Sequence, residues 1–112
     1  MTQPLVAAEA MLQTWLDKEN RHEHADEMQL AMTRRGSSFT IWDCRPPWDG
    51  KPGDWTRMPC ARLTLDREHL TWTMQWPNRN SKWLPYDRLP PTAIFQKVLD
   101  ELKSDPWACF WG

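Results

Sequence analysis

Aromatic and basic side chains are interleaved in the middle of the chain, between residues 42 and 62. A tryptophan ring can stack on a nucleic-acid base or form the centre of a protein interface, and an arginine can neutralise a phosphate. Both chemistries belong to binding surfaces, so we expect a binding surface here. The candidate binding residues are Trp42, Arg45, Trp48, Lys51, Trp55, Arg57 and Arg62.

Two kinds of partner suit this surface. The chain has a net charge of −1 and contains no RNP-type aromatic signature or other nucleic-acid motif. Residues 34–97 nevertheless hold eleven Lys or Arg against six acids, whereas residues 1–27 hold six acids and two bases. Because the net charge is near zero and no nucleic-acid motif is present, we expect a protein partner. The basic middle of the chain leaves weak nucleic-acid binding through the same surface as the alternative. A homodimer stays open, because nine tryptophans in 112 residues can bury aromatic surface against a second copy.

Metal binding has one candidate segment, in which His22 and His24 precede Asp26 and Glu27. Alternate residues share a face only if the segment is extended, and a closed zinc site needs four ligands at recognisable spacing. We interpret these residues as a solvated polar loop and expect no metal and no cofactor.

Catalysis lacks a sequence signature. The available groups are a cysteine with His69 as a thiol pair, or carboxylates as acid and base. Turn positions account for several of these acids, and no base is tied to either cysteine by spacing, so we expect no enzyme. The groups considered are Cys44, Cys60, Asp43, Asp49, Asp54, Asp66 and Glu68.

The three cysteines, Cys44, Cys60 and Cys109, are odd in number and include no C-x-x-C pair. This usage is typical of reduced thiols and predicts a cytoplasmic protein. No apolar run approaches the roughly 20 residues that span a bilayer, and the N-terminus lacks the basic region of a signal peptide. We expect no membrane partner.

Apolar periodicity predicts one α+β domain over residues 1–112, with an antiparallel sheet of four to five strands and helices on one face. A 3–4 spacing of Leu5, Ala8, Leu12 and Trp15 predicts a helix over about 4–19. Alternating apolar residues predict the strands. Their expected ranges are about 27–34, 38–44, 60–66, 70–76 and 81–86.

The second helix is predicted over about 91–104, opening at Pro91 and Thr92. The apolar tail, residues 107–112, is expected to dock on the body. A long Pro- and Gly-rich loop is predicted over 45–59, and Pro85 places the last strand at an edge. The helix should bury Ile94, Phe95, Val98, Leu99 and Leu102, and the fourth strand Leu70, Trp72, Met74 and Trp76.

Several motifs of the second half resemble a family of bacterial small proteins catalogued as domain of unknown function 3024. These motifs are Arg45-Pro46-x-Trp48, Trp55, Ala61-Arg62, Trp72-x-x-x-Trp76, Asn78-Arg79-x-x-x-Trp83-x-x-Tyr86 and Phe110-Trp111-Gly112. The resemblance spans roughly residues 22–112 and implies a compact bacterial domain, with no activity to carry over. The chain departs from the family pattern at Arg62 and at Leu84, where the family places a Lys-type residue and a His. An ionisable role at position 84 is therefore absent here.

Overall fold

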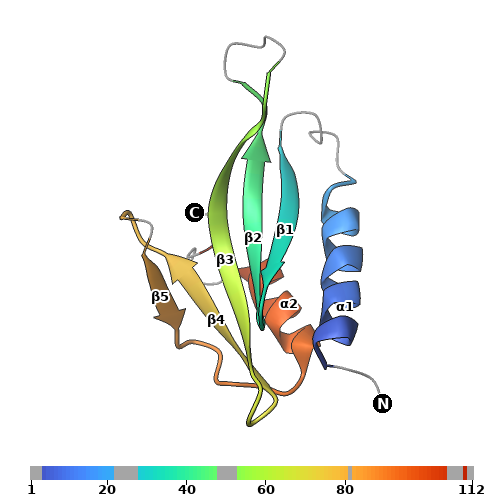
Figure 1. Ribbon diagram of the computed structural model, residues 1–112, viewed down its shortest axis with the longest axis vertical. Helices are drawn as coiled ribbons and strands as arrows, with labels where there is room; N and C mark the ends of the chain where they lie inside the picture. Colours follow the sequence, from blue (N-terminus) through green and yellow to red (C-terminus); the bar gives the residue numbers. More distant parts are fainter. Residues whose placement is uncertain (1–3, 22–27, 48–52, 81, 106–109, 111–112) are drawn as a thin grey trace.

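The computed structural model describes residues 4–21, 28–47, 53–80, 82–105 and 110. A first helix, α1 (Pro4–Glu19), precedes the strands, and a second helix, α2 (Phe95–Ser104), follows them. The strands are β1 (Gln29–Arg35), β2 (Ser38–Arg45), β3 (Thr56–Asp66), β4 (Thr71–Pro77) and β5 (Trp83–Tyr86). They form one antiparallel sheet in the order β1-β2-β3-β4-β5 (Figure 1). The predicted α+β class is confirmed.

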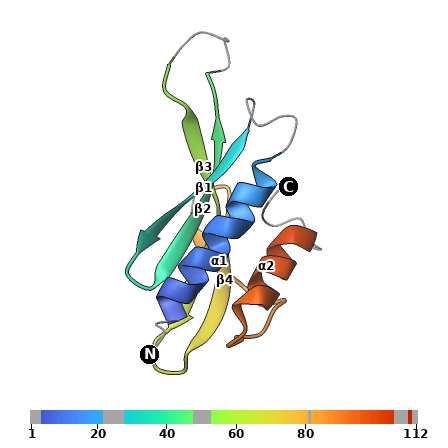
Figure 2. The same cartoon turned by 90° about the vertical axis from the view of Figure 1, so that its right-hand side faces the viewer.

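Both helices cover the same face of the sheet and lie side by side on it (Figure 2). From α1 the buried side chains are Leu5, Ala8, Leu12 and Leu16, which recur every three or four residues as an amphipathic helix requires. From the strands, the inward positions of the period-two pattern are buried, such as Phe39 and Ile41 in β2. Of the helices in the described part of the chain, none has both the length and the apolarity of a membrane span.

Three aromatic rings form the centre of the core. Trp72, which is 2% exposed, stacks on Phe39 with ring centroids 5.7 Å apart and meets Phe95 of α2 edge-on at 4.7 Å. These offset and edge-to-face arrangements are the favoured ones for aromatic pairs. Tyr86 of β5 packs on Phe110 at 4.9 Å, and Phe110 is buried. The other residues of the predicted tail lie outside the described residues.

The second helix begins four residues later than predicted. Thr92 exchanges two backbone hydrogen bonds with Trp72, at 2.7 and 3.1 Å, so this residue continues the sheet instead of opening a helix. Ile94 then acts as N-cap in an extended conformation, and its side chain is 54% exposed. The prediction that Ile94 faces the core was therefore wrong, whereas the other four apolar residues predicted for this helix are buried.

Leu70 is a second correction. The sequence pattern placed it on the buried face of the fourth strand, but it lies in the turn between β3 and β4 and is 51% exposed. The strand begins at Thr71, one residue later. Leu70 adopts a positive φ of 53°, which stops the regular alternation before the strand starts.

The β2–β3 hairpin extends past the ends of its neighbours (Figure 1). Strand β3 begins at Thr56, so residues 56–59 belong to the strand and not to the predicted loop. Strand β4 pairs with β3 only from Arg62 onward, so no described strand pairs with Thr56–Ala61 on that side. We call residues 43–45 and 56–58, which pair with each other, the arm. A β-bulge at Cys60, where the register shifts between Ile41 and Trp42, separates the arm from the body.

Candidate functional site

The face of the sheet opposite the helices, here called the outer face, carries two arginine–tryptophan pairs. Successive strand residues point to opposite faces, so Trp42 after buried Ile41, Arg62 after buried Ala61 and Gln75 after buried Met74 point outward. Among the described strand residues of this face, Asp66 is the only acid, and it is engaged by His69 at 2.8 Å. The remaining charged residues there are Arg35, Arg57 and Arg62.

The first pair joins β2 and β3 at the base of the arm. The Arg57 guanidinium carbon lies 4.2 Å from the centroid of the Trp42 ring, which is the geometry of a cation–π contact. The indole N–H of Trp42 donates to the hydroxyl of Thr33 at 2.9 Å. Trp42 is thus fixed by a hydrogen bond at its edge and covered by a cation on its face.

The second pair spans β3 and β5. The Arg62 guanidinium carbon lies 5.0 Å from the Trp83 ring, and its Nε donates to Gln75 Oε1 at 3.4 Å. Gln75 Oε1 also accepts from Thr64 at 2.8 Å, and the hydroxyls of Thr64 and Ser38 are 3.0 Å apart. This network crosses three strands and fixes the rotamers around Arg62. Fixed side chains lose less entropy when a partner binds, so the surface is organised in advance.

The structure brings together only part of the predicted set. Trp42, Arg57 and Arg62 share the outer face. Arg45 lies on the other side of the arm, where its guanidinium pairs with Asp43 at 3.1 and 3.3 Å. Trp55 precedes β3 and is 41% exposed. The two remaining candidates, Trp48 and Lys51, lie outside the described residues.

Trp83 is the member that sequence reasoning missed. Its position could have been found from the period of two, because Tyr86 is inward and a residue three positions before it in the same strand must point outward. Its contact with Arg62 depends on the pairing of β3 with β4 and of β4 with β5, which cannot be read from one strand alone.

The alternatives considered for chemistry find little support in this geometry. Asp66, Glu68 and His69 lie close enough to share an ion, but all three are exposed. Asp66 already bonds the His69 ring and accepts from the backbone N–H groups of His69 and Glu68, and these contacts lower the pKa of its carboxyl. These hydrogen bonds stabilise the β3–β4 turn, so the turn is sufficient to explain why the three residues lie together. The segment with His22 and His24 lies outside the described residues.

The cysteine candidates are poorly suited to act as nucleophiles. Burial, with a contribution from the nearby Asp43 charge, raises the pKa of the Cys60 thiol to about 12, and burial also raises the pKa of Cys44. A catalytic thiol needs the opposite shift and an adjacent base. The ring nitrogen of His69 bonds Asp66, so this residue is engaged elsewhere.

The pH dependence of stability tests whether the Cys60 thiol, at the bulge, is buried. Because the folded-state pKa of the Cys60 thiol, about 12, exceeds the ordinary value of 9.0, the unfolded chain loses the proton first as pH rises. The free energy of unfolding should therefore fall as the pH rises from 9 toward 12, by roughly 1 kcal/mol at pH 10. Urea unfolding of the wild type and of Cys60→Ala at pH 8 and pH 10 measures this loss. An equal loss in both proteins would show that Cys60 is not the cause.

The sequence matches the family described as Domain of unknown function (DUF3024) over residues 2–112. The chain belongs to this family. The match to DUF3024 includes α1, which the resemblance in the second half did not reach. No curated protein and no solved structure matches the chain.

The motifs that resembled DUF3024 divide between the two faces of the sheet. Trp72 forms the centre of the core, and Tyr86 donates to Glu101 of α2 at 2.5 Å. Asn78 accepts from the backbone N–H groups of Asn80 and Lys82 and so stabilises the β4–β5 turn. Arg62 and Trp83, by contrast, meet on the outer face. Folding therefore explains Trp72, Asn78 and Tyr86, and it does not explain the Arg62–Trp83 pair.

Proposed function

We propose that this DUF3024 chain is a non-enzymatic protein-binding module, which uses the outer face and the arm to engage an acidic surface of another protein. The observation that carries the proposal is the pair of guanidinium groups held over Trp42 and Trp83. Tryptophan and arginine are the residues most enriched at the energetic centres of protein interfaces. An adaptor, a regulator or an inhibitor in the cytoplasm of a bacterium would use such a surface, and the free thiols of Cys44 and Cys60 suit that compartment.

The same observation favours protein over nucleic acid. Stacking on a base needs an open ring face, but in both pairs a guanidinium covers one face of the ring. An arginine fixed over a ring presents its remaining N–H groups to solvent, where they match the two oxygens of a carboxylate. The absence of any acid besides Asp66 on the described strand residues of this face adds to the preference for an acidic partner.

The arm also offers an apolar contact, on the side opposite Arg57, because Met58 pairs with Asp43. Met58 is 70% exposed and lies on the arm, close in sequence to exposed Trp55. A methionine adapts its shape to irregular surfaces, which suits it to a protein interface. The proposed contacts therefore comprise fixed cations on the outer face and an exposed methionine on the opposite side of the projecting hairpin.

The double variant Arg57→Gln/Arg62→Gln tests the proposal. We expect proteins captured by the immobilised wild type to lose at least tenfold in recovery with this variant, since removal of an interface centre costs about 2 kcal/mol or more. The control Arg79→Gln/Arg88→Gln removes the same charge from exposed turn and loop positions and should capture like the wild type. Unfolding should change by only about 1–2 kcal/mol in the test variant, since each exposed cation–π contact contributes about 0.5–1 kcal/mol.

A second measurement decides between the partner classes. The anisotropy of labelled random-sequence RNA and DNA is followed as protein is added, at low and at physiological salt. We expect no saturable binding at physiological salt. Micromolar binding that falls steeply with salt, and that the double variant loses, would contradict a protein partner and support nucleic acid, because phosphate contacts release counterions.

A further inference from the structure

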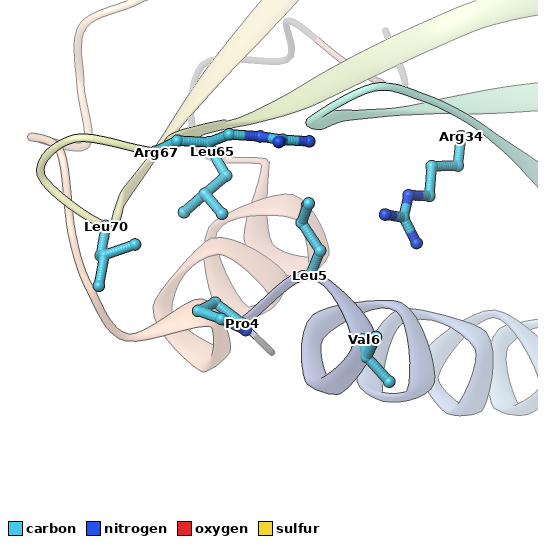
Figure 3. Close-up of a pocket in the computed structure, with 7 residues that line it drawn as sticks. All are labelled: Pro4, Leu5, Val6, Arg34, Leu65, Arg67 and Leu70. Carbon is cyan, nitrogen blue, oxygen red and sulfur yellow. The ribbon is translucent and has the colours of Figure 1, made fainter. Parts of the chain in front are cut away.

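A pocket of about 390 Å³ lies on the helix side of the sheet, between the start of α1 and the β3–β4 turn (Figure 3). We call it the turn pocket. Its apolar walls are formed by Pro4, Leu5, Leu65 and Leu70, and two cations, Arg34 and Arg67, also line it. The volume falls within the range of about 300–1,000 Å³ that is usual for small-molecule sites. The pocket is separate from the outer face and independent of the function proposed for that face.

The two arginines converge on the pocket. In Figure 3 the side chains of Arg34 and Arg67 extend toward each other above Leu5. Arg34 bonds Glu9 through Nη1 at 3.1 Å and Gly36 O through Nε, and Arg67 Nε donates to Ser37 Oγ. Each guanidinium has five N–H donors, and these contacts fix its position while leaving donors of Nη2 without a bond to any described residue. An anion between them would accept from two oriented groups.

Leu70 supplies an independent reason to expect a ligand. Its φ of 53° lies in the left-handed region, where glycine and asparagine are favoured and a leucine is strained. The side chain gains little burial in return, because it is 51% exposed. Neither the turn nor the core explains a leucine at this position. Strain of this kind is concentrated at functional sites, and Leu70 lies at the wall of the pocket.

We propose that the turn pocket binds a small aliphatic carboxylate. The carboxylate would lie between the guanidinium groups of Arg34 and Arg67, and the aliphatic chain would pack on Leu5, Leu65 and Leu70. The pairing of two cations with an apolar wall decides the class: an alcohol of the same length lacks the charge, and a short acid lacks the chain. The bound ligand would bury the Leu70 side chain, which the folded chain alone leaves half exposed.

Octanoate, below the concentration at which it forms micelles, is the probe. We expect saturable 1:1 binding that shifts the amide resonances of Leu5, Leu65 and Leu70, with 1-octanol and acetate each at least tenfold weaker. Arg67→Gln should weaken octanoate about tenfold, as loss of a charged hydrogen bond does. Arg79→Gln, on the distant β4–β5 turn, should bind like the wild type. Absence of saturable binding, or equal binding of octanoate and 1-octanol, overturns the proposal.

The variant Leu70→Asn separates ligand binding from folding. Asparagine tolerates the left-handed conformation, so this variant should raise the Tm by about 4 °C while weakening octanoate several-fold. A lower Tm would show that Leu70 is held for packing and would remove the argument from strain. Unchanged octanoate affinity in this variant would place the ligand elsewhere and overturn the assignment of the pocket.

Discussion

Replacement of Trp72 by Ala is expected to destabilise the folded chain by about 3–5 kcal/mol. The side chain contacts Phe39 of β2 and Phe95 of α2, so its loss leaves a cavity where the sheet meets the second helix. Small domains have about 5–15 kcal/mol of total stability, so this single change removes a large fraction. Urea denaturation of the purified variant, followed by far-UV circular dichroism, measures the change.

Trp55→Ala is the matched control for this prediction. Trp55 is 41% exposed and lies just before β3, so its replacement should change the free energy of unfolding by no more than about 0.5 kcal/mol. The difference between the two stability changes tests whether Trp72 stabilises the core while Trp55 lies on the surface and contributes little to folding. A cost below about 1.5 kcal/mol for Trp72→Ala would contradict its place at the centre of the core.

Replacement of Asn20 by Ala is expected to cost about 2 kcal/mol, the second largest effect we predict. The Asn20 side chain accepts from the backbone N–H of Leu30 and donates to the backbone C=O of the same residue, both at 2.8 Å. It thereby satisfies two backbone groups on the free edge of β1 and joins the end of α1 to the sheet. Alanine leaves both groups partly buried without these partners.

Asn20→Asp is the graded control, because a carboxylate still accepts from the Leu30 N–H but cannot donate to the C=O. We expect its cost to be at least half that of Asn20→Ala. Urea unfolding gives the two free energies, and hydrogen exchange at the Leu30 amide should be faster in the alanine variant than in the aspartate variant. A cost within 0.5 kcal/mol for Asn20→Ala would show that water replaces the side chain without loss.

Much of the fold could be predicted because the spacing of apolar residues in the sequence matches the buried positions along most helices and strands. The 3–4 spacing of α1 gave its bounds, Pro4–Glu19, and the alternation in β2 gave its buried residues. The errors occur where long-range contacts override local pattern. Thr92 follows a proline and resembles a helix start, but its backbone pairs with Trp72, twenty residues earlier in the chain. Leu70 continues an alternating pattern, but the turn geometry takes it out of the strand.

The candidate site was predicted less completely than the fold. The sequence predicted that Trp42, Arg57 and Arg62 lie on the surface. Arginine is rarely buried, and Trp42 lies on the face of its strand opposite the core residues Phe39 and Ile41. The pairing of each arginine with a particular ring depends on strand register and on the bulge at Cys60. Neither is encoded in a short segment, so Arg62–Trp83 became visible only in the folded structure.

The bulge at Cys60 determines on which face of the sheet the residues of the arm lie. Arg57 and Arg62 are five positions apart, and an odd separation in a regular strand places two side chains on opposite faces. The extra residue in β3 makes the count even, so both arginines point away from the helices. Deletion of Cys60 would remove the bulge and leave the two arginines four positions apart in a regular strand, so both would still point to the outer face. Among homologous chains, a separation of five between these two arginines should therefore accompany the bulge, and a separation of four should accompany a regular β3.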